Sequence, residues 1–116
     1  MIEFSNVTKY YEDDVILKDL TFTIDKGELA FITGPSGAGK STLLKMIYCD
    51  ERPDRGRIVV AGWDIGQLKQ KTIPFLRRNV GIVFQDFPQP EQAFIACILT
   101  SRVIHIKQNC SKLLLL

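Results

Sequence analysis

The feature that most constrains the fold of this chain is the segment at residues 34–42. It reads Gly-Pro-Ser-Gly-Ala-Gly-Lys-Ser-Thr, follows the apolar run at 29–33 and precedes another apolar run at 43–47. The spacing is that of the phosphate-binding loop, G-x-x-x-x-G-K-[ST], between an expected strand and an expected helix. The sequence therefore predicts an α/β fold with a nucleoside triphosphate site where that helix begins.

Each residue type in this loop has its own part in binding phosphate. Gly34, Gly37 and Gly39 let the backbone curl so that its N–H groups point at phosphate oxygens. Lys40 supplies a compact cation for the β- and γ-phosphates, and the Ser41 hydroxyl is placed to coordinate Mg²⁺. The predicted nucleotide-binding residues are Gly34, Pro35, Ser36, Gly37, Ala38, Gly39, Lys40, Ser41 and Thr42. A glycine-rich turn that matches by chance is the alternative, and the flanking runs disfavour it.

The composition of the 116 residues is that of an ordinary soluble domain. With 46% hydrophobic residues, 24% charged residues and a net charge of +2, nothing favours a nucleic-acid partner. The basic pairs Lys69/Lys71 and Arg77/Arg78 are typical of a solvated helix face. Three cysteines without metal-binding spacing suit a reducing compartment. Because no signal sequence or membrane-spanning run is visible, we expect a cytoplasmic protein that reaches the membrane only through a partner.

The hydrophobic pattern predicts a small antiparallel element before the loop, with a turn at 25–28, and further strands after it. The expected elements are strands at 2–7, 20–25, 29–33, 57–61 and 80–84, a helix at 40–48, and a helix that begins at Pro74 and includes 75–78. The run at 80–84 is continuous and apolar, as in a buried strand of a parallel sheet. A break at 52–56 and a turn at Gly62 separate these elements.

The composition changes near the end of the chain. All 13 acidic residues lie within positions 1–91, whereas the last 25 residues have no acid, glycine or proline. We therefore expect two parts, residues 1–87 and a divergent tail at 88–116, such as a truncated or frameshifted gene would produce. The alternative is that 93–99 form one more buried helix or strand.

Three motifs in order give the chain its resemblance to a known family. The chain resembles the N-terminal half of an ABC-type ATPase domain at three places: Tyr11, the loop at 34–42, and Gln85, which directly follows the run at 81–84. The resemblance implies that Tyr11 stacks on the adenine of ATP. It also implies that Gln85 is catalytic, reaching both Mg²⁺ and the attacking water, so that Ser41 and Gln85 together hold the metal.

Longer stretches are similar to the branch of this family that acts in bacterial cell division. The similar stretches are 37–45, 51–53, 56–58 and, most of all, 73–87. The resemblance implies a partial P-loop ABC-type nucleotide-binding domain with an N-terminal antiparallel β element, ending before the helical subdomain. It also implies a homodimer around two ATP molecules, working with a membrane protein at the inner face of the plasma membrane.

From residue 88 onward the chain departs from the family pattern. The LSGGQ signature, the apolar strand ending in Asp-Glu and the switch histidine are not found, and His105 is given no such role. We therefore expect ATP binding without hydrolysis, and a strand at 29–33 with unpaired edges. The open alternatives are a fragment without function and a kinase of the guanylate kinase type, although that family places its loop after a single strand.

Overall fold

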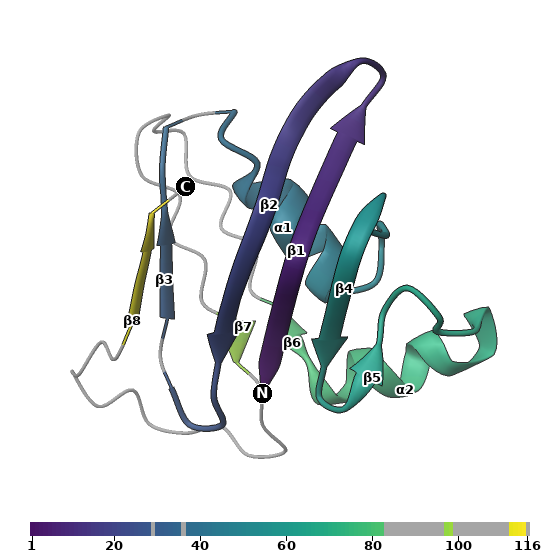
Figure 1. Cartoon of the computed structure of the whole chain (residues 1–116). Coiled ribbons are helices and arrows are strands. Elements are labelled where there is room, and N and C mark those ends of the chain that lie inside the picture. The colour runs from purple at the N-terminus through teal and green to yellow at the C-terminus, as the bar shows by residue number, and fades with distance from the viewer. Residues whose placement is uncertain (29, 36, 83–96, 99–111, 116) are drawn as a thin grey trace.

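An antiparallel sheet of four strands, in the order β2-β1-β4-β5, forms one layer of the molecule (Figure 1). This computed structural model describes residues 1–28, 30–35, 37–82, 97–98 and 112–115. The strands of the sheet are β1 (Ile2–Tyr11), β2 (Asp14–Ile24), β4 (Arg55–Val60) and β5 (Trp63–Asp64). The predicted antiparallel element before the loop is therefore present.

Strands β1 and β2 extend the predicted strands at 2–7 and 20–25 into one long hairpin that reaches Tyr11. The prediction was too short because the alternation of apolar and polar residues is interrupted. Asn6 and Asp19 have positive φ angles of 49° and 47°, and the β1–β2 pairing shifts register at several points. Each shift moves the side chains that follow to the opposite face of the strand. Apolar residues therefore no longer recur at every second position.

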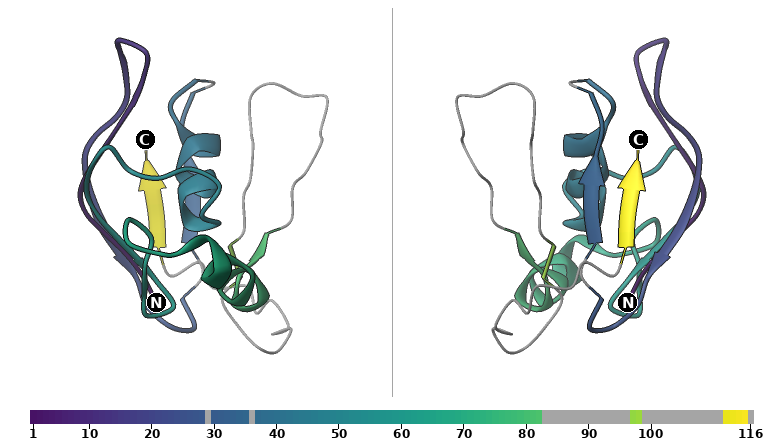
Figure 2. Two further views of the ribbon diagram at one scale, coloured as in Figure 1. Left: turned by 90° about the vertical axis from the view of Figure 1, so that its right-hand side faces the viewer. Right: turned by 90° about the vertical axis from the view of Figure 1, so that its left-hand side faces the viewer.

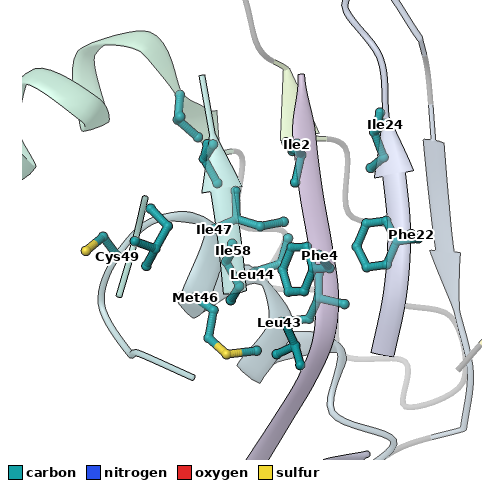
Figure 3. Close-up of a cluster of buried hydrophobic side chains, with 14 of the residues drawn as sticks. Ile2, Phe4, Phe22, Ile24, Leu43, Leu44, Met46, Ile47, Cys49 and Ile58 are labelled. Carbon is teal, nitrogen blue, oxygen red and sulfur yellow. The ribbon is translucent and has the colours of Figure 1, made fainter. Parts of the chain in front are cut away.

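The second layer contains strand β3 (Ala30–Thr33) and helix α1 (Lys40–Ile47), both close to their predicted bounds. The helix lies against one face of the antiparallel sheet, as the side views show (Figure 2). Side chains from both layers make the core, where the rings of Phe4 and Phe22 stack with their centroids 4.6 Å apart (Figure 3). Burial of this helix face against the sheet holds the start of α1, and with it the loop, in place.

Strand β3 is paired along one edge by β8 (Lys112–Leu115), which runs parallel to it. The register runs from Ala30 opposite Lys112 to Thr33 opposite Leu115. The expectation that the strand at 29–33 has unpaired edges is therefore wrong for this edge. The expectation rested on the departure from the family pattern after residue 87, but a short apolar run is suited to a parallel strand, so that departure could not exclude this pairing.

The segment after α1 follows the prediction more closely. Strands β4 and β5 are joined by a two-residue turn in which Ala61 and Gly62 both have positive φ, the signature of a type I′ hairpin. A short 3₁₀ turn, η1 (Gln70–Thr72), leads into α2 (Ile73–Asn79), with Pro74 in its first turn as expected. Neither α1 nor α2 is long enough to cross a membrane, and no other described helix is either.

The apolar run at 80–84 is only partly as predicted. Val80 is buried and β6 (Gly81–Ile82) follows it, but β6 pairs antiparallel with β7 (Cys97–Ile98) rather than in a parallel sheet. An apolar run indicates burial but leaves the direction of the partner strand undetermined. Residues 83 and 84 lie outside the described part of the chain.

Candidate functional site

The predicted phosphate-binding loop connects β3 to α1 and has the backbone shape that requires glycine. Gly37 and Gly39 have φ angles of 80° and 93°, which other residues rarely adopt. A Cβ at Gly39 would also come within 2.7 Å of the Leu17 Cδ2 atom and 3.1 Å of the Ile16 carbonyl oxygen, whereas one at Gly37 would meet nothing within 4 Å. The β1–β2 hairpin therefore packs directly against the last turn of the loop.

The first turn of α1 is free to receive an anion. Gly39 precedes the helix without any side-chain cap, and no acidic residue lies in the first turn. The Leu43 amide donates to the Gly39 carbonyl at 2.9 Å, so the three amides before it have no acceptor within the helix. Unsatisfied amides together with the positive end of the helix dipole favour a negatively charged group such as phosphate.

The Lys40 side chain folds back over the loop. Its ammonium donates hydrogen bonds to the carbonyl oxygens of Gly34 and Pro35, at 2.6 and 2.7 Å. The only cation in the loop is thus held against carbonyl groups at the start of the loop. A phosphate arriving at the first amides of α1 would replace neutral carbonyls with a charged acceptor, and charge-assisted hydrogen bonds are roughly twice as strong as neutral ones.

The structure describes some of the remaining predicted site residues and not others. Ser41 is exposed in the first turn of α1, Thr42 is buried, and the Ala38 amide donates to the Pro35 carbonyl at 3.1 Å. Ser36 and Gln85 lie outside the described residues, so the pairing of Ser41 with Gln85 as metal ligands remains a prediction. The donors that are described fit a triphosphate, and the exposed Ser41 hydroxyl suits a hard cation such as Mg²⁺.

Tyr11, the predicted adenine-stacking residue, ends β1 and is 40% exposed. Its hydroxyl donates to the Oε1 atom of Glu51, which lies just beyond the end of α1. The Glu51 amide in turn donates to the Lys45 carbonyl at 3.2 Å, so Glu51 is fixed to the last turn of the helix. Tyr11 is therefore tied to the helix whose first turn carries the phosphate-binding groups.

Two lysines surround the Glu51 carboxylate. The ammonium of Lys45 is 3.4 Å from Oε1, and that of Lys9 is 3.9 Å from Oε2. The Oε2 atom is buried and has no hydrogen-bond partner among the described residues. The hydrogen bond with Glu51 is the main reason that the pKa of Lys45 is raised, and the electrostatic influence of Tyr11 and Glu51 acts in the same direction. The carboxylate that accepts the tyrosine hydroxyl is thus flanked by two ammonium groups.

A second carboxylate fastens the end of β1 to the segment after α1. Asp54 accepts the Tyr10 amide at 2.8 Å and lies 3.4 Å from the Lys9 ammonium. The bond from the Tyr10 amide is the main reason that the pKa of Asp54 is lowered. Sequence reasoning did not find Lys9, Glu51 or Asp54, since partners forty or more residues apart leave no local signal.

Comparison with known proteins identifies the family of the chain. The profile of the ABC transporter family matches residues 17–112. The cell division ATP-binding protein FtsE of Escherichia coli strain K12 is 52% identical over 87 residues, which is 74% of this chain and 39% of that protein. FtsE of Bacillus subtilis is 49% identical over 88 residues, with 75% and 39% covered. The predicted resemblance to the cell-division branch is confirmed, and the chain spans about two-fifths of the length of these relatives.

Other matches agree on the fold. The methionine import ATP-binding protein MetN 3 of Oceanobacillus iheyensis is 44% identical over 75% of this chain and 27% of that protein. The dimeric structure of MJ0796, a bacterial ABC transporter cassette, superposes with a TM-score of 0.68 at 36% identity, covering 76% of this chain and 40% of that one. These matches confirm a partial ABC-type domain and exclude the guanylate kinase alternative.

Proposed function

This chain belongs to the ABC transporter family, and on that basis we propose that it binds Mg-ATP as part of an ABC ATP-binding subunit. The observation that carries the proposal is the arrangement of the loop, in which Lys40 begins an uncapped helix and its ammonium folds back onto the Gly34 carbonyl. A nucleoside triphosphate is the ligand class that needs a cation, free amides and a hydroxyl for the metal within one short segment.

Each part of the site has a separate task in this proposal. The amides at the start of α1 bind the phosphate oxygens, and Lys40 exchanges its bonds to Gly34 and Pro35 for bonds to the triphosphate. Ser41 and Gln85 would hold Mg²⁺, which when bound offsets the charge that builds up on the phosphates. Tyr11 offers its exposed ring to the adenine.

We further propose that the subunit acts in bacterial cell division. The relatives named FtsE support this, and the dimeric cassette of similar fold supports pairing of two copies. The partner would be an FtsX-like membrane protein, which would bring the subunit to the inner face of the plasma membrane. Nucleic acid has no place in this proposal, because the net charge is only +2.

Hydrolysis is a separate matter from binding. We propose that a polypeptide of residues 1–116 binds ATP without turning it over, because its carboxylates do not match the family's water-polarising pair. Asp64 is held by the Arg57 guanidinium at 2.8 Å, and Asp86 and Glu91 lie outside the described residues. Steady phosphate release that disappears in Lys40→Ala would contradict this proposal.

Titration calorimetry with Mg-ATP tests the binding proposal. Lys40→Ala should weaken Mg-ATP by roughly 10- to 150-fold, the range that corresponds to one hydrogen bond to a charged group. Lys71→Ala is the matched control, because Lys71 is an exposed lysine in η1, outside the loop. Equal affinity of wild type and Lys40→Ala would refute the proposed site.

A further inference from the structure

We propose that Glu51 is a positioning residue for the adenine base. By accepting the Tyr11 hydroxyl, it fixes the aromatic ring relative to α1, so that the exposed part of the ring is ready for stacking before the nucleotide arrives. The inference rests on the proposed ATP site, and it gives a role to a residue outside the phosphate-binding loop.

Tyr11 needs such a restraint because of its place in the fold. It is the last residue of β1, at the tip of the long hairpin, where 40% of its surface is exposed. Immobilising a side chain of this kind on binding lowers affinity by about 2- to 10-fold. A side chain that is already held in the free protein avoids that loss.

Glu51 is suited to provide the restraint because it is itself held at both ends. Its amide and that of Asp50 both donate to the Lys45 carbonyl, at 3.2 and 2.7 Å. Its carboxylate lies between the ammonium groups of Lys45 and Lys9, with only 20% of the side chain exposed. A fixed acceptor, in contrast to a freely rotating one, can define where the tyrosine hydroxyl lies.

The link also sets the distance between the two halves of the site. Helix α1 begins at Lys40 and ends just before the segment that carries Glu51. A helix of this length is about 12 Å long and rigid on the scale of a bound ligand. The groups for phosphate and the ring for the base therefore belong to one unit, although Tyr11 is in β1 and Lys40 is in α1.

One side of the ring is already occupied. The Lys9 ammonium lies over the Tyr11 ring, 5.8 Å from its centroid, and the Lys9 side chain is only 13% exposed. The base must therefore stack on the part of the ring that Lys9 leaves open. A cation over the ring and a carboxylate at the hydroxyl hold Tyr11 in a single orientation.

The test compares two ligands, Mg-ATP and inorganic tripolyphosphate with Mg²⁺, by calorimetry on the full chain. Glu51→Ala and Tyr11→Phe remove the same hydrogen bond from its two sides. Each should weaken Mg-ATP by about 2- to 10-fold and leave tripolyphosphate within about twofold of wild type. The double variant should be no weaker than the weaker single variant, because both changes remove one interaction.

Two further variants separate positioning from general stability. Glu51→Gln keeps an acceptor oxygen for the tyrosine hydroxyl and should restore most of the affinity lost in Glu51→Ala. Asp50→Ala is the control, because Asp50 is the neighbouring carboxylate and pairs with Arg77 rather than Tyr11. Asp50→Ala should leave the ratio of the affinities for Mg-ATP and tripolyphosphate unchanged. If Glu51→Ala does not fold, Tyr11→Phe and Glu51→Gln still decide the matter.

Three results would overturn the inference, each in a recognisable way. Equal losses for both ligands in Glu51→Ala would mean that Glu51 supports only the fold. Wild-type affinity for Mg-ATP in both Glu51→Ala and Tyr11→Phe, while Lys40→Ala still loses it, would reject positioning but keep the ATP site. No difference between wild type and Lys40→Ala would remove the ATP site itself, and with it this inference.

Discussion

Arg77 of α2 lies over the ring of Tyr48, just beyond the end of α1, with its guanidinium carbon 4.2 Å from the ring centroid. The same guanidinium donates to the Tyr48 carbonyl at 3.2 Å and lies 3.7 Å from the Asp50 carboxylate. One side chain thus caps the helix that follows the phosphate loop and joins it to the segment that leads towards Gln85.

Loss of this contact should destabilise the protein measurably. We expect Arg77→Ala to lower the free energy of unfolding by about 1–2 kcal/mol, from a cation–π contact and a cation at a helix C-terminus. Urea denaturation measures the change. Arg78→Ala is the matched control, since Arg78 is exposed and lies over the ring of Phe75 within α2 alone. An equal loss of unfolding free energy in Arg78→Ala and Arg77→Ala would contradict the capping role.

Two glycines of the loop should differ in their tolerance of alanine. Gly37→Ala costs only the strain of a positive φ angle, about 1–2 kcal/mol, because its Cβ would meet open space. Gly39→Ala adds a clash with Leu17 and Ile16, so it should cost more and also displace the loop. Thermal melts and Mg-ATP affinity should both rank wild type first, Gly37→Ala second and Gly39→Ala last. Equal behaviour of the two variants would contradict the close packing of the hairpin against the loop.

The start of α1 and its loop could be predicted from the sequence because the governing interactions are local. Loop glycines, the lysine and the apolar runs all fall within about twenty residues, and the observed helix bounds differ by one residue from the prediction. Pro74 similarly marked the first turn of α2. Local patterns of this kind reflect backbone preferences that do not depend on the rest of the fold.

The remainder could not be predicted because it depends on long-range pairing. Nothing near Glu51 indicates that it contacts Tyr11, and nothing in the leucine run indicates that Lys112–Leu115 pairs with β3. The antiparallel pairing of β6 with β7 could not be predicted either, because an apolar run does not specify its partner strand or the direction of that strand. These contacts and pairings are set by the fold as a whole and not by the residues next to them in the sequence.

The Asp54 carboxylate should give a pH-dependent contribution to stability. Its pKa is lowered in the folded state, mainly by the hydrogen bond from the Tyr10 amide, so the stabilisation is present above the unfolded-state pKa and is lost as the pH falls through the folded-state value. Because the side chain is 41% exposed, we expect only about 0.5–1 kcal/mol after solvent screening. Asp54→Asn should lower the free energy of unfolding by this amount at pH 7, and at acidic pH the two proteins should have the same stability. A constant difference between the two proteins from pH 7 to pH 3 would contradict the assignment.

Pairing of β8 with β3 should contribute to stability. Removal of residues 112–116 would leave the paired edge of β3 open, with a loss of about 1–3 kcal/mol for two or three hydrogen bonds. An open edge also promotes association, so sedimentation should detect oligomers that depend on concentration. Removal of residue 116 alone is the control, because β8 ends at Leu115. A polypeptide that melts identically without 112–116 would show that β8 does not support β3.

The exposed ring of Tyr11 should contribute to the binding of nucleotides but not to the binding of the triphosphate group alone. Stacking of a base on an aromatic side chain contributes about 1–3 kcal/mol, so Tyr11→Ala should weaken Mg-ATP by roughly 5- to 150-fold and leave inorganic tripolyphosphate unchanged. Tyr11→Trp keeps an aromatic face and should retain more of the affinity than alanine does. Because stacking tolerates any base, Mg-GTP should lose affinity by a similar factor in Tyr11→Ala. Parallel calorimetric titrations with the three ligands measure these effects. If Tyr11→Ala lowers the affinity for tripolyphosphate as much as the affinity for Mg-ATP, Tyr11 supports the loop through the hairpin and does not contact the base.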